Sequence, residues 1–398
     1  MKRKSKGIGA LPVDLKVRNR MLILNAIKDG NLYSAADIAK ETGISRPTVV
    51  KSIQYFIDRN LIVSQGKGES TEIGGKKPEL YGFIYKKLLL TITMWPDFLA
   101  LNLCTMNLKK IASVKIEAPI KNNPQEAFDL IREKSLSLIT QQGYQLSDLY
   151  GVSLSTAGTI DYETGNLKYS SRTPLWGTNV PIKKHMREIF GEKVEILIEN
   201  AGKMTGRYEL VRSEEEQNRI LVLFSTWGLS ACLIERGHVL SGDDSLIGEV
   251  GHMVIDPHDE VLCGCGSYGC AERMLSIEKV KRLSKNEDIT FEELFIASQK
   301  GEEWAREIVK YLANTFAYLV RNISLVFNPN VVVFQGDYSH ADDYFKNTLK
   351  NRLSEFKYYP KGGAFEIEYN EMSLEELDLS GALNFLQRKF FQDEALYQ

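Results

Sequence analysis

A segment rich in cysteine and glycine limits how this chain can fold more than any other feature. Three of the five cysteines, Cys263, Cys265 and Cys270, stand within eight residues and are separated by glycines. His252 lies eleven positions upstream of the first of them. Thiolates and imidazole are the ligands that tetrahedral Zn²⁺ prefers, and three cysteines with one histidine fill all four positions. We predict one structural zinc per chain; the alternative is a loop of unligated thiols.

A second histidine, His258, is a rival for the fourth ligand position. It lies in the polar stretch 256–260, whose sequence Asp-Pro-His-Asp-Glu predicts a turn, so His252 is the better candidate. Cysteines at metal-binding spacing suit a reducing compartment better than a disulfide framework does. The basic N-terminus precedes no apolar segment, and no apolar run is long enough for a membrane span. We expect a cytoplasmic protein with no membrane partner.

Two motifs around these ligands resemble those of the ROK (repressor, ORF, kinase) family. The first is Glu-Val-Gly-His at 249–252, and the second is Cys-Gly-Cys-Gly-Ser-Tyr-Gly-Cys-Ala-Glu at 263–272. The resemblance extends from about residue 15 to the C-terminus. It implies that the histidine and the three cysteines bind zinc, and that Glu249 and His252 contact sugar hydroxyls.

Strand and helix patterns alternate from about residue 86 onward. The apolar run 194–198 indicates a buried strand, and 302–327 carries apolar side chains at helical spacing. This order of elements fits two α/β lobes around a cleft, and it resembles the actin-like (ribonuclease H-like) fold of sugar kinases. We predict a first lobe at 86–200 plus about 375–398. A second lobe at 201–374 should hold the zinc loop and dimerisation helices.

The first 82 residues carry 15 Lys and Arg against 8 Asp and Glu, although the whole chain has a net charge of −2. A basic head on an acidic body is expected where only the head meets a polyanion. After a basic tail at 1–14, residues 15–82 show a helix, a short helix, a glycine turn and a further capped helix. This is the helix-turn-helix pattern. A strand, a hairpin and a second strand follow, as in a winged helix.

The second helix of this motif enters the major groove in DNA-binding proteins. The Ser-Arg-x-Thr-Val pattern at 45–49 and the Gly-Gly-Lys-Lys-Pro pattern at 74–78 resemble patterns in repressors of the ROK family. The resemblance implies that the basic pair of the second pattern approaches the minor groove. The candidate DNA-contacting residues are Ser45, Arg46, Thr48, Lys51, Ser52, Lys76 and Lys77. The alternative is a small helical domain that docks on a protein.

A kinase of the resembling family needs a catalytic base and glycine-rich phosphate loops. Where those kinases have Glu-Asn-Asp, this chain has Glu-Asn-Ala, and Ala201 cannot accept a proton. Glu199 is two positions away, which is about 6 to 7 Å along an extended strand. The first phosphate loop, at 91–98, contains no glycine, and the second keeps only Gly228 beside Trp227. We expect no kinase activity.

Part of the family's sugar site remains in the sequence. The candidate effector-binding residues are Gly158, Arg172, Asn200, Glu249, His252 and Glu272. Arg172 stands where the family usually offers an asparagine. An arginine in this place suits a carboxylate or a phosphate on the ligand, and a solvent-facing arginine is the alternative.

The sequence therefore predicts a DNA-binding transcriptional regulator, foremost a repressor, of carbohydrate metabolism genes. Its body should be an inactive sugar-kinase fold that binds a sugar or sugar derivative as effector. We expect a homodimer, able to pair into a tetramer, on a palindromic double-stranded operator. Two alternatives stay open: an ATP-dependent sugar kinase with an appended DNA-binding domain, and a regulator controlled by a protein partner.

Overall fold

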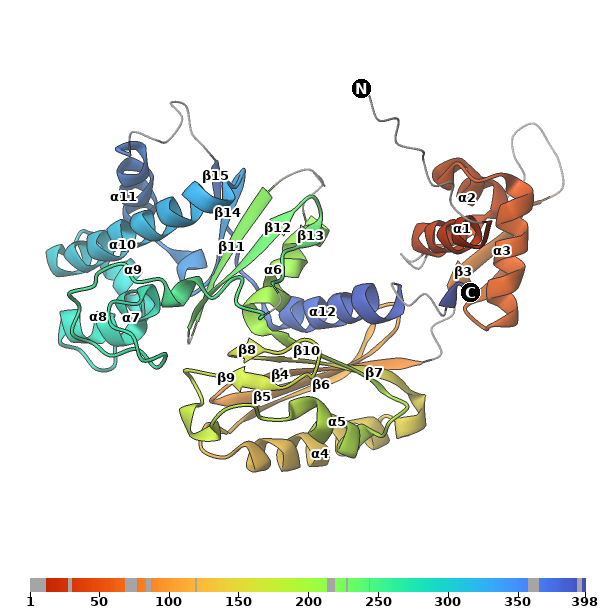
Figure 1. Cartoon of the computed structure of the whole chain (residues 1–398), viewed down its shortest axis with the longest axis horizontal. Helices are drawn as coiled ribbons and strands as arrows, with labels where there is room; N and C mark the ends of the chain where they lie inside the picture. Colours follow the sequence, from red (N-terminus) through yellow and green to blue (C-terminus); the bar gives the residue numbers. More distant parts are fainter. Residues whose placement is uncertain are drawn as a thin grey trace, which may run out of the picture.

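A computed structural model shows a small N-terminal module and two larger lobes (Figure 1). It describes residues 12–27, 31–68, 77–83, 87–118, 120–212, 219–226, 228–242, 244–356, 365–391 and 396–398. Within these ranges, no helix is both long enough and apolar enough to cross a membrane.

The N-terminal module is a winged helix. Its elements are α1 (Pro12–Ala26), β1 (Tyr33–Ser34), α2 (Ala35–Thr42), α3 (Arg46–Asp58), β2 (Ile62–Lys67) and β3 (Glu79–Phe83), with the strands in the antiparallel order β1-β3-β2. A capping box between Ser34 and Asp37 begins α2, because each side chain accepts a hydrogen bond from the other residue's backbone N–H. Gly43 ends α2 in the left-handed region, at φ 69°.

Lobe 1 is built on a five-stranded sheet in the order β10-β7-β4-β5-β6. The strands are β4 (Leu88–Met94), β5 (Phe98–Thr105), β6 (Lys110–Glu117), β7 (Leu149–Thr156) and β10 (Glu195–Asn200). Helices α4 (Pro124–Gln141) and α5 (Ile182–Phe190) cover one face of the sheet (Figure 1). A two-stranded ribbon of β8 (Thr159–Ile160) and β9 (Leu167–Tyr169) follows β7.

Lobe 2 has a second five-stranded sheet, in the order β13-β12-β11-β14-β15. The strands are β11 (Arg219–Ser225), β12 (Leu229–Glu235), β13 (His238–Val239), β14 (Val331–Gly336) and β15 (Glu366–Tyr369). The helices are α6 (Ala201–Arg212), α7 (Ala271–Met274), α8 (Ile277–Ser284), α9 (Phe291–Lys300), α10 (Glu303–Phe327) and α11 (Asp343–Ser354). Buried side chains along α10, among them Phe316, pack with β14 and α11 to form the core of this lobe.

The C-terminal segment connects lobe 1 to the N-terminal module. Helix α12 (Leu374–Phe385) packs on β4, β7 and α6 and continues as a π-helical turn, Leu386–Phe390. The chain then ends against the module (Figure 1). Tyr397 is fully buried, its ring lies edge-on to Phe56 of α3 at 6.4 Å, and its carbonyl accepts a hydrogen bond of 2.8 Å from Arg20.

Our sequence-based boundaries placed all of 375–398 in lobe 1. The structure differs at the very end, because residues 396–398 pack within the N-terminal module. Tyr55 of α3 also donates a hydrogen bond of 3.1 Å to the Leu396 carbonyl. The contact joins residues more than 300 positions apart, so local sequence patterns carry no sign of it.

Candidate effector site, metal centre and DNA-binding surface

The parallel strands β4, β7 and β10 bring the candidate sugar residues to one edge of lobe 1. Met94, Thr156 and Asn200 are lateral partners at the carboxyl ends of these strands. Ligands of open α/β sheets bind at this edge. Trp95 and Ala201 directly follow two of these residues and line the same cavity as Asn200.

Asn200 and Gly158 are held against each other. Asn200 Nδ2 donates to the Gly158 carbonyl at 2.9 Å, and Asn200 Oδ1 accepts from the Lys203 backbone N–H at 3.2 Å. Gly158 has φ 112°, and a Cβ there would lie 2.5 Å from the Tyr169 carbonyl oxygen, so this turn requires glycine. The amide of Asn200 is therefore already oriented in the ligand-free protein.

The Glu-Val-Gly-His motif forms a short 3-10 turn, Val250–His252, beside β12. A Cβ at Gly251 would lie 2.2 Å from the Leu229 carbonyl oxygen, which explains the glycine. The partly buried Glu249 carboxylate accepts a hydrogen bond of 3.3 Å from Thr159 of lobe 1. Burial raises the pKa of Glu249, and the charges of His252 and Lys203 oppose that rise. Glu249 is thus a carboxylate of lobe 2 that already contacts lobe 1.

Arg172 lies in the wall of this cavity and forms ion pairs there, while its buried Nε has no hydrogen-bond partner among the described residues. Its guanidinium is 3.6 Å from the buried Glu272 carboxylate and 4.0 Å from Glu278. Glu272 is held in addition by the Leu229 backbone N–H at 3.2 Å and by the Ser171 hydroxyl at 3.3 Å. The guanidinium is therefore paired with Glu272 in the cavity wall, instead of facing solvent.

The six candidate effector residues all line one cavity between the lobes. Gly158, Arg172, Asn200, Glu249, His252 and Glu272 form its walls together with Trp95, Thr159, Tyr169 and Phe224. Its volume is about 60 Å³, whereas ligand pockets enclose roughly 300–1,000 Å³. The cavity is therefore smaller in this conformation than a pocket that encloses a sugar. The sequence analysis missed Thr159 and Tyr169, since neither lies in a recognisable motif.

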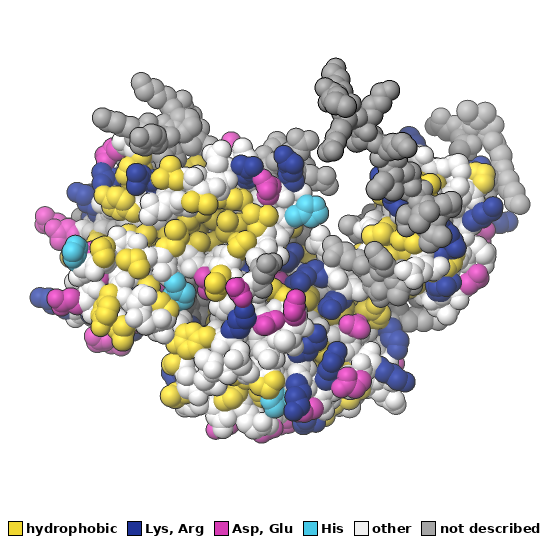
Figure 2. Space-filling view, in the orientation of Figure 1, with side chains coloured by type: hydrophobic (Ala, Val, Ile, Leu, Met, Phe, Trp, Pro, Cys, Tyr) yellow, Lys and Arg dark blue, Asp and Glu magenta, His cyan; other side chains and the backbone are white. Residues whose placement is uncertain are grey.

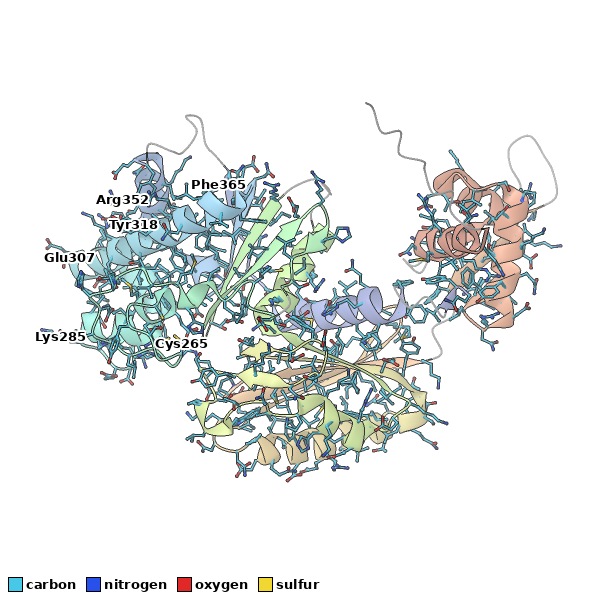
Figure 3. All side chains as sticks on the ribbon, viewed as in Figure 1. Cys265, Lys285, Glu307, Tyr318, Arg352 and Phe365 are labelled. Carbon is cyan, nitrogen blue, oxygen red and sulfur yellow. The ribbon has the colours of Figure 1, made fainter. Side chains whose placement is uncertain are left out.

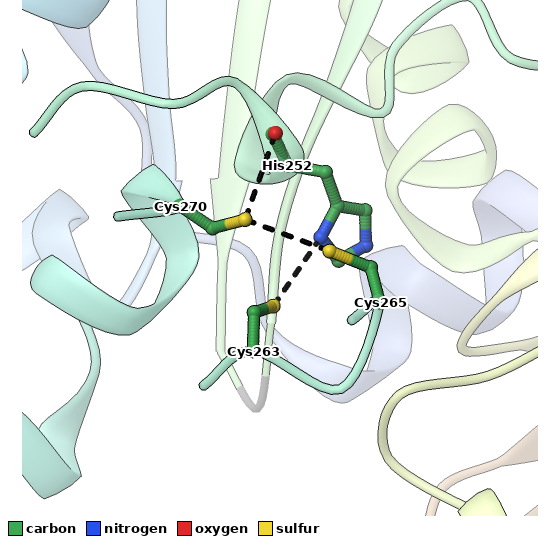
Figure 4. Close-up of side chains that lie close together, drawn as sticks. All are labelled: His252, Cys263, Cys265 and Cys270. Atoms are coloured by element: carbon green, nitrogen blue, oxygen red, sulfur yellow. Dashed lines mark hydrogen bonds between the residues drawn. The ribbon is translucent and has the colours of Figure 1, made fainter. Parts of the chain in front are cut away.

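The predicted zinc ligands come together at the edge of lobe 2 (Figure 4). His252 Nδ1 lies 3.6 Å from Cys263 Sγ, the sulfurs of Cys265 and Cys270 are 3.5 Å apart, and all four ligand atoms lie within 4.8 Å of one another. Ligands at zinc distances of about 2.0–2.3 Å form a tetrahedron with edges of about 3.3–3.8 Å. These residues therefore fit zinc, and the exposed His258 is not among them.

The loop that carries the three cysteines, 263–270 (the metal-binding loop of the prediction), also bridges the two lobes. The Tyr169 hydroxyl of lobe 1 donates a hydrogen bond of 2.6 Å to the Gly264 carbonyl, in the middle of the loop. Figure 3 shows Cys265 at the edge of lobe 2 that faces lobe 1. A zinc ion bound here would fix the His252 ring at the wall of the sugar cavity and hold the loop against β9.

Side chains fill the space at the first phosphate loop. Trp95, in the turn after β4, packs on Phe224 of lobe 2 with ring centroids 6.0 Å apart, and Ala201 joins the same buried cluster. A larger cavity, of about 1040 Å³, lies in lobe 2 beside Asp337. Burial raises the pKa of Asp337 to about 7. The second phosphate loop includes Trp227, which lies outside the described residues.

The candidate DNA-contacting residues are partly exposed along α3. Arg46 and Lys51 are exposed, and the Ser45 hydroxyl is 2.9 Å from that of Thr48 instead of capping the helix. Ser52, predicted to contact DNA, is only 6% exposed, so its side chain is not on the surface of α3. Val50, in the same helix, is 47% exposed.

The structure describes only one of the two lysines predicted on the wing. Lys77 is exposed, and Lys76 lies outside the described residues. Figure 2 shows Lys and Arg side chains along the outer edge of the module, where α3 runs in Figure 1. Asp and Glu side chains lie among them on the same edge.

Comparison with known proteins agrees with this geometry. The model of the ROK family matches residues 94–383, well over half of the chain. The chain belongs to the ROK family. The winged helix lies outside the matched residues, so the family model alone does not account for it.

Members of the ROK family with different functions are similar to this chain. The xylose repressor of Caldicellulosiruptor bescii is 24% identical over 90% of this chain and 92% of its own length. A glucokinase of Thermotoga maritima is 23% identical, over 60% of this chain and 79% of its own length. A solved ROK family transcriptional regulator, a homolog of the Escherichia coli MLC protein, has a TM-score of 0.78 at 17% identity and covers 93% of this chain and 96% of its own. That likeness shows that the fold extends through the N-terminal module.

The metal centre generates the first prediction. Purified protein should contain about one zinc per chain, because its four ligands fill the tetrahedral coordination of a structural site. Cys265→Ser should lower the zinc content far below that of the wild type, since a hydroxyl is a poor zinc ligand. Cys104→Ala, at a buried cysteine outside the cluster, is the matched control. Elemental analysis measures the zinc content of the wild type and of both variants, and limited proteolysis of the 253–270 loop shows whether the loop keeps its structure. A Cys265→Ser protein with the zinc content of the wild type would contradict the ligand set.

Proposed function

We propose that this chain is a DNA-binding transcriptional repressor of carbohydrate metabolism genes, and that a sugar bound between its lobes changes its affinity for DNA. One observation carries the proposal: the candidate sugar residues of the ROK body line one cavity, and the C-terminal segment connects that body to the winged helix. The similarity to a xylose repressor over almost the whole length of both chains supports it. A cytoplasmic location fits this role.

We assign the DNA contacts to the exposed side of the winged helix. Arg46, Thr48 and Lys51 would read bases or phosphates in the major groove, Val50 would offer an apolar contact, and Lys77 would approach the minor groove from the wing. One recognition helix per chain reads one half-site, so we propose a homodimer on a palindromic operator, able to pair into a tetramer. Binding should weaken steeply with salt, because each neutralised phosphate adds about −0.9 to the log-log slope.

We further propose that the body has no kinase activity. Ala201 offers no proton acceptor, and the neighbouring carboxylate, Glu199, is fully buried and hydrogen-bonded to Tyr162 at 2.5 Å and Arg388 at 2.9 Å. A base must reach the hydroxyl that it deprotonates, and a carboxylate held by these partners does not. Trp95 occupies the turn that would carry phosphate-binding glycines.

The same buried carboxylate offers a route between the two sites. Glu199 directly precedes Asn200, and its partner Arg388 lies in the π-helical turn after α12. Phe390, two residues later, packs its ring on Phe83 of the wing strand β3 at 5.3 Å. A movement at the end of β10, where Asn200 lies, would therefore reach the wing through Arg388 and Phe390. It would reach α3 through Tyr397, at the end of the same C-terminal segment.

The effector function is tested with the Glu249→Ala variant. DNA sites are first selected from random sequence with the wild-type protein, and affinity is then measured by fluorescence anisotropy with D-xylose, D-glucose or N-acetyl-D-glucosamine. We expect one of these sugars to change wild-type affinity by about 5- to 150-fold, the usual range of allosteric coupling. Glu249→Ala should bind DNA normally and show no response. A variant that responds as the wild type does would place the sensing site elsewhere.

The absence of catalysis is tested with a coupled ATPase assay across the same sugars. We expect no turnover above a mock purification, because the base is missing and Trp95 replaces a phosphate loop. Ala201→Asp should not restore activity, since restoring the base leaves the loop unchanged. Sugar-dependent ATP consumption by the wild type would favour the alternative, a sugar kinase with an appended DNA-binding domain.

The route through the C-terminal segment is tested with Arg388→Gln. This variant should still bind sugar and DNA, because Arg388 touches neither ligand and because Tyr162 and Arg207 still compensate the Glu199 carboxylate. Most of the effect of sugar on DNA affinity should disappear. Lys389→Gln, in the same turn and of the same charge change, is the control and should respond fully. An undiminished response in Arg388→Gln would show that the signal travels by another path.

A further inference from the structure

The sugar cavity has one corner made of apolar side chains from both lobes. Trp95 and Phe98 of lobe 1, Ala201 at the start of α6, and Phe224 of lobe 2 belong to one buried cluster. Ala157 packs against it. Trp95, Ala157, Ala201 and Phe224 are also walls of the cavity, so the ligand faces this cluster directly.

The polar groups of the same cavity form a separate set. Glu249 accepts a hydrogen bond from Thr159, and Glu272 accepts one from Ser171. The Asn200 amide donates a hydrogen bond to the Gly158 carbonyl. These groups can accept and donate hydrogen bonds to sugar hydroxyls. Thr226 and Ser230 also line the cavity, but the four apolar side chains of the corner offer no acceptor. A sugar hydroxyl buried against them would lose its hydrogen bonds to water without replacement.

From this division we infer that the effector is a neutral pyranose whose edge at C5 carries no hydroxyl, namely a pentopyranose or a 6-deoxyhexose. The inference rests on the proposed sugar effector and names its chemical class. An aldopyranose bears a hydroxyl on each ring carbon except C5, which carries a hydroxymethyl group in hexoses. That edge is a methylene in pentopyranoses and bears a methyl group in 6-deoxyhexoses. It is therefore the edge that suits Trp95, Ala201 and Phe224.

The Arg172–Glu272 pair agrees with a neutral ligand. Arg172 is engaged by two carboxylates, and Glu249 is a further carboxylate in the cavity. A sugar acid or sugar phosphate would meet more negative than positive charge. Apolar pockets discriminate against an added hydroxyl by roughly 100-fold, so the preference for the deoxy edge should be large enough to measure.

The experiment compares sugars that differ by a single hydroxyl on the full-length, zinc-loaded protein. Isothermal titration calorimetry gives affinities for D-glucose and 6-deoxy-D-glucose, for D-galactose and D-fucose, and for D-xylose. We expect the deoxy sugar of at least one pair to bind roughly 10- to 100-fold more tightly than its hexose, or D-xylose to bind more tightly than D-glucose by the same factor. Equal or stronger binding of the hexoses throughout would overturn the inference while leaving the sugar effector intact. No binding of any of these sugars would remove both.

Two substitutions test whether the corner causes the preference. Ala201→Ser supplies a hydroxyl partner in the corner and should reduce the preference for the deoxy sugar by about tenfold. Ala100→Ser is the matched control, because Ala100 belongs to the same cluster but does not line the cavity, and its preference should equal that of the wild type. An unchanged preference in Ala201→Ser would overturn the assignment of the corner.

The indole of Trp95 needs a control of its own, because it carries an N–H donor. Trp95→Phe keeps an aromatic wall and removes that donor, so the preference should persist. Its loss in Trp95→Phe would mean that the N–H group, and not the apolar surface, selects the sugar, and would contradict the inference.

Discussion

The buried carboxylate of Glu199 is the interaction on which the arrangement of this protein depends. A carboxylate without water is costly by several kcal/mol unless charge and hydrogen bonds compensate it. Here Arg388 and Tyr162 bind it directly, and Arg207 lies 3.7 Å away. These partners come from the C-terminal turn, from the segment after β8 and from α6. Glu199 therefore holds three parts of the chain around the strand that ends in Asn200.

The two lobes are tied by contacts of different kinds on either side of the sugar cavity. On one side, Tyr169 and Thr159 of lobe 1 bond to the metal-binding loop and to Glu249. Elsewhere, Trp95 packs on Phe224. Both sets include residues that line the cavity of about 60 Å³. Under the proposed function, sugar binding would change these contacts between the lobes, and only a ligand that prefers one arrangement of the lobes can shift the protein toward it.

Much of the site could be predicted from the sequence because its signals are local. The spacing of His252 and the three cysteines suits zinc coordination, and Glu-Asn-Ala stands in three consecutive residues where β10 ends and α6 begins. Ser52 was misjudged because the phase of α3 is decided by packing against α1 and α2, not by the polarity of one residue. The contacts of Arg388 with Glu199 and of Tyr397 with Phe56 join distant positions, so they emerge only from the fold. The apolar corner around Trp95 likewise needs both lobes in place.

The central claim is that sugar binding and DNA binding are linked by one coupling free energy. A closed thermodynamic cycle tests this claim most directly. DNA affinity is measured with and without saturating sugar, and sugar affinity with and without saturating DNA, for the wild-type protein. The account predicts the same factor in both directions, within about 5- to 150-fold, because coupling between two sites is reciprocal. A sugar that binds tightly while DNA affinity stays the same, and whose own affinity ignores DNA, would contradict it.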